Sequence, residues 1–125
     1  MAKRVLVVDD HPPTVQLIRA ALEGMSLEVA SAGNGAEALL DIQQHPPALV
    51  ILDVMMPIMD GFQTMRVLRQ DPKTENLPVI LLTARSTDED LARGWSSGAS
   101  CYLTKPFQVD ELTTLVKRML EEDSG

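Results

Sequence analysis

Short apolar runs alternate with amphipathic segments along this whole chain, and that alternation leaves very few folds open to it. The apolar runs lie at 4–8, 27–32, 48–52, 78–83 and 100–104. The runs at 48–52 and 78–83 are nearly continuous in Val, Ile and Leu, which is typical of strands buried on both faces of a sheet. The segments between the runs place apolar residues at helical spacing. Alternating strands and helices predict a doubly wound α/β fold, a parallel sheet with helices on both faces.

The helices are indicated by their first residues and by their apolar stripes. Pro12 and Pro13 lead into the first helix, Asn34 and Asp60 are predicted to cap the second and third, and Thr87 is expected to begin a fourth. The positions expected to face the core in the first, second, third and last helices are Val15, Ile18, Leu22 and Met25; Ala38, Leu39 and Ile42; Phe62, Met65 and Leu68; and Val109, Leu112, Leu115, Val116 and Met119. Doubly wound sheets bind ligands outside the carboxyl ends of their strands, so this edge is where chemistry is expected.

The composition narrows the class of protein. We expect one domain, 1–125, with no output domain in this chain. No apolar segment approaches the ~20 residues of a membrane span, and the first residues leave no room for a signal peptide. A net charge of −7 argues against direct nucleic acid binding, which needs a basic face. The lone Cys101 fits a reducing compartment, so a cytoplasmic location without membrane association is expected.

Polar residues stand where four of the predicted strands end. Asp9 and Asp10 follow the first strand, Asp53 follows the third, Thr83 ends the fourth and Lys105 follows the fifth. The second strand ends in Ser-Ala-Gly, without a charged group. Because parallel strands bring their carboxyl ends to one edge, these side chains are expected to converge.

Three carboxylates at one edge favour a metal ion. Left alone, they repel one another and raise each other's pKa, and a hard divalent cation relieves that repulsion. Mg²⁺ prefers oxygen ligands and keeps several waters, so Asp10 and Asp53 are expected as direct ligands, with Asp9 acting through water. A zinc or copper site is disfavoured, because neither Cys101 nor His45 is placed to complete a soft-metal set.

A carboxylate, a lysine, a hydroxyl and Mg²⁺ together are suited to phosphoryl transfer. Asp53 can attack phosphorus to form an aspartyl phosphate, while the cation and Lys105 neutralise charge on the transferring group. The Thr83 hydroxyl can donate a hydrogen bond to a phosphoryl oxygen. Each residue alone is a weak signal, since an Asp at a strand end is more often a cap or a turn former. Their joint occurrence at the strand ends is the basis of the prediction.

Four segments give the chain a resemblance to a known family. They are VLVVDDHP, LVILDVMMPIMDG, VILLTA and GASCYLTKPF. Together they resemble the receiver domain of bacterial two-component response regulators, over essentially the full length of the chain. The resemblance implies a flavodoxin-like (βα)5 fold with strand order 2-1-3-4-5. It also implies a signalling switch rather than an enzyme, with self-phosphorylation and self-dephosphorylation at most.

The resemblance implies a role for each site residue. Asp53 would accept a phosphoryl group from a sensor histidine kinase or a histidine phosphotransfer protein, and Lys105 would contact that group. Asp10, Asp53 and the Met55 carbonyl would bind Mg²⁺, assisted by Asp9.

The resemblance also implies how the signal leaves the site. Thr83 would move toward the phosphoryl group, and Tyr102, the switch aromatic, would change rotamer with it. The Lys105–Pro106 peptide bond is expected to be cis. The altered face would be read by a downstream protein target, or by the chain's own output domain if this sequence was excised from a longer regulator or hybrid kinase. Homodimerisation on activation is common in the family and stays open here.

Partner binding is expected near the first helix. His11, Pro13, Thr14 and Leu17 fall where family members meet their kinase, although Leu17 fits core packing equally well. Trp95 fits either a core filler or an exposed partner-binding position.

Two other functions fit parts of the pattern. A Mg²⁺-dependent phosphohydrolase acting through an aspartyl phosphate, like haloacid dehalogenase-like phosphatases, would need a second catalytic Asp where this chain has Met55. A flavodoxin-like cofactor binder would need aromatic side chains around the ring, and only 3% of the chain is aromatic. Both agree with the sequence less well than a receiver.

Overall fold

The computed structural model describes residues 2–84 and 98–124. Its elements are, in chain order, β1 (Arg4–Val8), α1 (Pro12–Glu23), β2 (Glu28–Ala32), α2 (Gly35–Gln44), β3 (Leu49–Asp53), α3 (Gly61–Gln70), β4 (Val79–Thr83), β5 (Cys101–Thr104) and α5 (Val109–Ser124). Every predicted strand is present, with each end within one residue of the expected position. The fourth predicted helix, with Thr87, lies outside the described residues.

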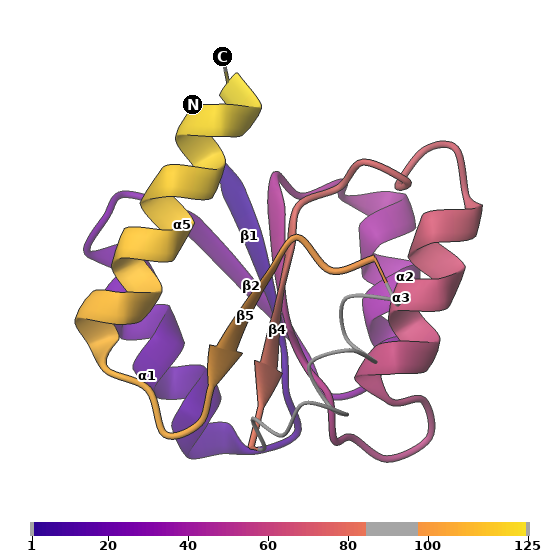
Figure 1. Ribbon diagram of the computed structural model, residues 1–125, viewed down its shortest axis with the longest axis horizontal. Helices are drawn as coiled ribbons and strands as arrows, with labels where there is room; N and C mark the ends of the chain where they lie inside the picture. Colours follow the sequence, from indigo (N-terminus) through magenta and orange to yellow (C-terminus); the bar gives the residue numbers. More distant parts are fainter. Residues whose placement is uncertain (1, 85–97, 125) are drawn as a thin grey trace.

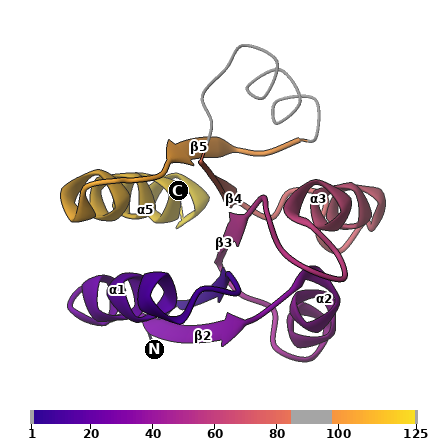
Figure 2. The same ribbon diagram turned by 90° about the horizontal axis from the view of Figure 1, so that it is seen from below.

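The strands form a parallel sheet in the order β2-β1-β3-β4-β5. Figures 1 and 2 show α1 and α5 on one face of this sheet and α2 and α3 on the other. The predicted doubly wound, flavodoxin-like fold and its strand order are thereby confirmed. Since β1 and β3 are neighbours at the point where the strand order reverses, the loops that follow them meet at the carboxyl edge.

Alternate residues of each strand enter different cores. In β1, Val5 and Val7 join the core on the α1 and α5 side, whereas Leu6 and Val8 join the core on the α2 and α3 side. The two faces are served equally because successive side chains of a strand point in opposite directions. Each fully buried Val, Leu or Ile side chain stabilises the fold by about 1.5–3 kcal/mol relative to an exposed one.

The predicted caps of α2 and α3 are confirmed. The Asn34 side chain accepts a hydrogen bond from the Glu37 amide at 3.0 Å. Asp60 accepts from the Gln63 amide at 2.8 Å, and the Gln63 side chain accepts from the Asp60 amide at 2.9 Å, which completes a capping box. Such caps stabilise a helix start by about 1 kcal/mol. The Asp60 cap also fixes the start of α3 at Gly61, after the loop that follows β3.

The predicted core stripe of α5 is correct in its middle and wrong at its start. Leu112 and Val116 are fully buried, but Val109 is 37% exposed. Val109 is the first residue of the helix and precedes the turn that packs on the sheet. Leu120, which the predicted stripe omitted, is buried at the other end of the helix.

In the described part of the chain, the two ends lie at the amino edge of the sheet, away from the carboxyl edge. In Figure 1 both ends of the chain lie at the top, at the edge opposite the strand arrowheads. The Lys3 ammonium donates to the Leu120 carbonyl at 3.2 Å, which ties the start of the chain to the end of α5. None of the helices in the described ranges is long and apolar enough to cross a membrane.

Candidate functional site

Side chains point to alternate faces along a strand, and this determines which residues of the site lie together. The Asp9 amide donates to the Ala32 carbonyl at 3.1 Å, and the Lys105 amide donates to the Thr83 carbonyl at 2.7 Å, so the ladder continues one residue past β1 and β5. Asp53 is itself the last residue of β3. Each of Asp9, Asp53 and Lys105 lies two residues after a member of the core on the α1 and α5 side. Their side chains therefore emerge together on that side of the carboxyl edge.

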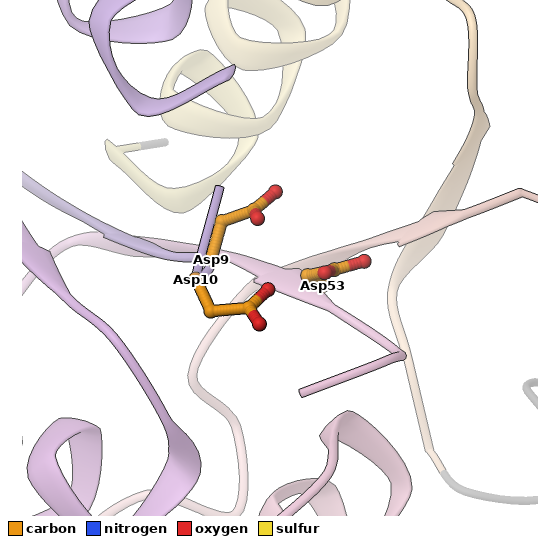
Figure 3. Close-up of side chains that lie close together, drawn as sticks. All are labelled: Asp9, Asp10 and Asp53. Carbon is orange, nitrogen blue, oxygen red and sulfur yellow. The ribbon is translucent and has the colours of Figure 1, made fainter. Parts of the chain in front are cut away.

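Three carboxylates converge there, as the sequence predicts. Asp9, Asp10 and Asp53 each offer a carboxylate oxygen, and these atoms lie within 4.8 Å of one another (Figure 3). Asp9 and Asp53 are only 3% and 6% exposed, whereas Asp10 is exposed. In Figure 3 the Asp9 and Asp10 side chains leave the end of β1 in different directions, with Asp53 beside them at the end of β3. Two buried carboxylates thus adjoin one that solvent reaches.

Lys105 supplies positive charge to this cluster. Its Nζ lies 2.9 Å from Asp9 Oδ2 and 3.3 Å from Asp53 Oδ1. The other Asp9 oxygen, Oδ1, accepts a hydrogen bond from the His11 amide at 2.9 Å. Both oxygens of Asp9 consequently have protein partners within hydrogen-bond distance.

The two central groups of the site have shifted ionisation. Burial raises the pKa of the Asp53 carboxyl, and the Asp9 carboxylate raises it further, while Lys105 and the Met55 amide act in the opposite direction. Burial lowers the pKa of Lys105, but its hydrogen bonds to Asp9 and Asp53 and the charges of both carboxylates outweigh burial, so that pKa is raised overall. The ammonium form of Lys105 is favoured, while the anionic form of Asp53 is held at a cost in free energy.

Thr83 lies on β4, the strand next to Asp53, and Tyr102 lies on β5, one strand further along the sheet. Thr83 is the last residue of β4 and is 7% exposed. Asp53 is paired in register with Leu82, which places Thr83 one residue further along the neighbouring strand. Tyr102 is half-buried on β5 and packs against the core on the α2 and α3 side. The two proposed switch residues are therefore on adjacent strands of the same half of the sheet.

The loop that follows Asp53 approaches it closely. A Cβ atom at Gly61 would lie 2.5 Å from the Asp53 carbonyl oxygen, so glycine is required where α3 begins. The Gly61 amide donates to the Val54 carbonyl at 3.0 Å, which closes the loop on itself. The Met55 side chain is 73% exposed. This role of Gly61 was not predicted from the sequence, although the Asp-Gly pair at the start of a helix was a signal for it.

The residues predicted to meet a kinase lie on or beside α1 at the same edge. His11 and Pro13 are exposed, and Leu17 is 47% exposed, so Leu17 is not core packing. The His11 ring Nδ1 lies 2.8 Å from the Thr14 hydroxyl, and its side chain does not cap the helix. Next to them is a cavity of about 360 Å³, lined by Thr14, Leu17, Lys105, Pro106 and Phe107. The sequence did not single out Phe107, and Trp95 lies outside the described residues.

The Lys105–Pro106 peptide bond is cis, as the resemblance implied.

The donor set at this edge suits a hard cation. The clustered groups are carboxylate oxygens, which Mg²⁺ prefers, and the exposed Asp10 leaves one side open to water. The described residues bring no thiol or imidazole side chain into the cluster that would suit a soft metal. A buried carboxylate with a raised pKa beside a lysine can also react with phosphorus, provided that a cation shields the charge.

Comparisons with known proteins identify the family of the chain. The model of the response regulator receiver domain family matches residues 5–117. Response regulator Rre1 of Synechocystis sp. is 42% identical over 117 residues, which make up 93% of this chain and 51% of that protein. The signal receiver domain of a signal transduction histidine kinase from Syntrophus aciditrophicus has a TM-score of 0.91 at 36% identity, covering 97% of this chain and 92% of that one. The chain belongs to the response regulator receiver domain family.

A third relative was solved with an ion. The receiver domain of sensor histidine kinase PA1611 from Pseudomonas aeruginosa PAO1 has a magnesium ion coordinated in its active site cleft. It superposes with a TM-score of 0.89 at 26% identity, covering 97% of this chain and 99% of that one.

Family membership places the chain among the receiver domains of two-component signalling systems. It also disfavours the phosphohydrolase alternative, in agreement with the methionine at position 55. The chain spans about half the length of the curated relatives it matches, 51% of Rre1 for example.

Proposed function

We propose that this chain is a phosphorylation-activated switch that accepts a phosphoryl group on Asp53 in the presence of Mg²⁺. The observation that supports this best is the convergence of three carboxylate oxygens within 4.8 Å, with the Lys105 ammonium 3.3 Å from Asp53. Negative charge exceeds positive charge in this cluster, and a divalent cation that assists phosphoryl transfer would balance it. Residues 1–125 would form one receiver domain.

Asp10, Asp53 and the Met55 carbonyl would hold the Mg²⁺. Asp10 is the exposed member of the cluster, so its oxygens are accessible to an ion that keeps its waters. Asp9 would act through water, because its two oxygens already accept from Lys105 and from the His11 amide. When bound, the ion would neutralise charge on the phosphoryl oxygens and offset the repulsion among the carboxylates.

Asp53 would be the nucleophile. One of its oxygens would form the new bond to phosphorus while the bond from phosphorus to the donor's histidine nitrogen breaks, and the electron pair of that bond stays on the nitrogen. Lys105, which already lies between Asp9 and Asp53, would contact the transferred group and balance its charge. The raised pKa of Asp53 makes the carboxylate more basic than an exposed one.

Thr83 and Tyr102 would pass the event to the surface. The Thr83 hydroxyl would donate to a phosphoryl oxygen, and Tyr102 on the neighbouring strand would move inward behind it. The buried position of Thr83 and the half-buried position of Tyr102 leave both side chains room for only a few discrete arrangements. A charge added at Asp53 would therefore favour one arrangement over the other.

The partners we propose are proteins. A sensor histidine kinase or a histidine phosphotransfer protein would bind at the edge lined by His11, Pro13, Thr14 and Leu17, and Trp95 is proposed as a further partner contact. A downstream protein, or an output domain of a longer chain, would read the altered face, with homodimerisation as one form of that reading. We do not propose direct nucleic acid binding by this domain, because its net charge is −7. We propose a cytoplasmic location.

The test is transfer of ³²P from an autophosphorylated histidine kinase to the chain. We expect label on the parent chain that is released by hydroxylamine, as an acyl phosphate is, and no label on Asp53→Asn. The Thr83→Ala variant should take up label but change partner binding less than the parent chain does. Hydroxylamine-resistant label, or label retained by Asp53→Asn, would contradict the proposal.

A further inference from the structure

The Arg69 side chain links the end of α3 to two other segments at the amino edge of the sheet. Its Nε donates a hydrogen bond to the Gly98 carbonyl at 2.9 Å, and its Nη1 donates to the Thr74 carbonyl at 3.0 Å. Among the described residues, no carboxylate forms an ion pair with Arg69. Burial lowers the pKa of the Arg69 guanidinium, because the cation is partly removed from water. A charged side chain thus holds two neutral backbone carbonyls.

Gly98 is suited to this contact by its backbone and by its lack of a side chain. Its φ is 91°, a conformation that L side chains rarely adopt. A Cβ atom at this position would lie 2.9 Å from Arg69 Cγ and 3.2 Å from Arg69 Nε. Glycine is therefore required both by the backbone and by the close approach of Arg69.

The segment after Gly98 sets the position of β5 along β4. The Ser100 amide donates to the Val79 carbonyl at 3.0 Å, and the Val79 amide donates to the Ser100 hydroxyl oxygen at 3.1 Å. β5 has four residues and lies at the edge of the sheet, with β4 as its one neighbour among the described strands. Figure 2 shows the chain entering β5 from the side of α3. Because few ladder bonds hold so short an edge strand, its position also depends on the contacts at its ends.

The other end of β5 brings Lys105 to the site. The Lys105 amide donates to the Thr83 carbonyl at 2.7 Å, which continues the pairing of β5 with β4. Its ammonium lies 3.3 Å from Asp53 Oδ1. The carboxylates belong to other strands, because Asp9 and Asp10 follow β1 and Asp53 ends β3. A shift of β5 would therefore move the lysine relative to the carboxylates and leave the carboxylates in place.

We propose that Arg69 is a positioning residue for phosphoryl transfer: by holding the Gly98 carbonyl it fixes the start of β5, and β5 places the Lys105 ammonium beside Asp53. This inference rests on the proposed phosphorylation of Asp53. Catalysis depends steeply on such placement, and a displacement of about 1 Å can lower a rate about 100-fold. Loss of Arg69 should slow phosphoryl transfer and leave Mg²⁺ binding unchanged, since none of the proposed Mg²⁺ ligands lies on β5.

The experiment compares Arg69→Gln with a matched control, Arg66→Gln, which removes an exposed arginine from the same helix. Two quantities are measured on the full chain, at a temperature where circular dichroism shows each variant to be folded. They are the rate of labelling by ³²P-acetyl phosphate in saturating Mg²⁺ and the dissociation constant of Mg²⁺ from calorimetric titration. Arg69→Gln should lower the labelling rate about tenfold and change the dissociation constant by less than about twofold. Gly98→Ala, which disturbs the same contact from the other side, should give the same result, and Arg66→Gln should change neither quantity.

A double-mutant cycle tests whether Arg69 acts through Lys105. The cycle is measured in saturating Mg²⁺, which balances the carboxylates when the lysine is removed. Adding Arg69→Gln to Lys105→Ala should slow labelling by less than about twofold further, because the group that Arg69 positions is already gone. A purely structural role of Arg69 would give the same loss in both backgrounds.

A labelling rate for Arg69→Gln within about twofold of the parent rate would overturn the inference. A loss that persists in the Lys105→Ala background, or that is matched by an equal loss of Mg²⁺ affinity, would also overturn it, because Arg69 would then support the site as a whole. Failure of acetyl phosphate to label the parent chain would instead count against the proposed function itself, so the two failures are distinguishable.

Discussion

The amino and carboxyl edges of the sheet differ in how well their positive and negative side chains are balanced. At the amino edge, Arg4 Nη2 lies 2.8 Å from Asp41 Oδ2, and Arg4 Nη1 donates to the His45 carbonyl at 2.6 Å. One cation there is matched to one anion and to a helix end. At the carboxyl edge, three carboxylates gather with Lys105, so negative charge exceeds positive within the cluster. Matched charge stabilises the fold modestly, whereas unmatched, partly buried charge lowers its stability.

Removing the Lys105 ammonium from the carboxyl edge should have the largest effect on stability. Lys105→Ala leaves Asp9, whose side chain is fully buried, next to Asp53 without its counter-charge. We expect the free energy of unfolding to fall by about 3 kcal/mol in urea titrations at pH 7 without Mg²⁺. Lys117→Ala, which removes an exposed lysine from α5, is the control and should change it by less than about 0.5 kcal/mol. Equal losses of unfolding free energy in the two variants would show that Lys105 does not offset unbalanced negative charge at the carboxyl edge.

Adding a divalent cation should relieve the same edge. Mg²⁺ at ten times its dissociation constant should stabilise the chain by about 1.4 kcal/mol, because it binds the folded state. Asp10→Asn should abolish this gain, and Asp41→Asn at the amino edge should preserve it. The measurement is the melting temperature as a function of MgCl₂ concentration. A gain that survives in Asp10→Asn would place the ion elsewhere.

Neutralising Asp53 should also stabilise the chain, through its pKa. Since burial and Asp9 raise the pKa of Asp53 in the folded state, the folded chain holds the proton more tightly than the unfolded chain, and ionisation above that pKa lowers stability. Asp53→Asn should therefore raise the free energy of unfolding by an amount on the order of 1 kcal/mol at pH 7 without Mg²⁺. The gain should shrink as the pH falls through the ordinary carboxyl range, where both states are protonated. A gain that is constant from pH 3 to pH 7 would contradict this cause.

The smallest effect is expected at the matched edge. Asp41→Asn removes the partner of Arg4 from a pair whose side chains are 16% and 27% exposed. The expected loss is about 0.5 kcal/mol, reduced at high salt by screening. Urea titrations at two salt concentrations measure it. A loss larger than that of Lys105→Ala would invert the comparison of the two edges.

Much of this molecule could be predicted from its sequence, because its signals are local. The nearly continuous Val, Ile and Leu of β3 and β4 indicated central strands, and Asn34 and Asp60 indicated helix starts. The convergence of the three carboxylates followed from strand topology alone, since parallel strands end at one edge.

What could not be predicted depends on contacts between distant segments. The engagement of both Asp9 oxygens requires the actual path of β5 beside β4. The need for glycine at position 61 depends on how closely α3 passes the Asp53 carbonyl. Val109 was misplaced because periodicity does not show which turn of a helix reaches the sheet. The tight turn at Ile58, which has a φ of 67° and in which the Met59 amide donates to the Pro57 carbonyl at 2.7 Å, could not be predicted because its sequence lacks the glycine or asparagine that marks such turns.

The most direct test of the excess charge at the carboxyl edge is the intact mass of the chain after incubation with acetyl phosphate, in Mg²⁺ or in EDTA, beside Asp53→Asn. The predicted result is one added phosphoryl group on the parent chain in Mg²⁺, and none in EDTA or on Asp53→Asn. An adduct that forms in EDTA, or on Asp53→Asn, would contradict the account.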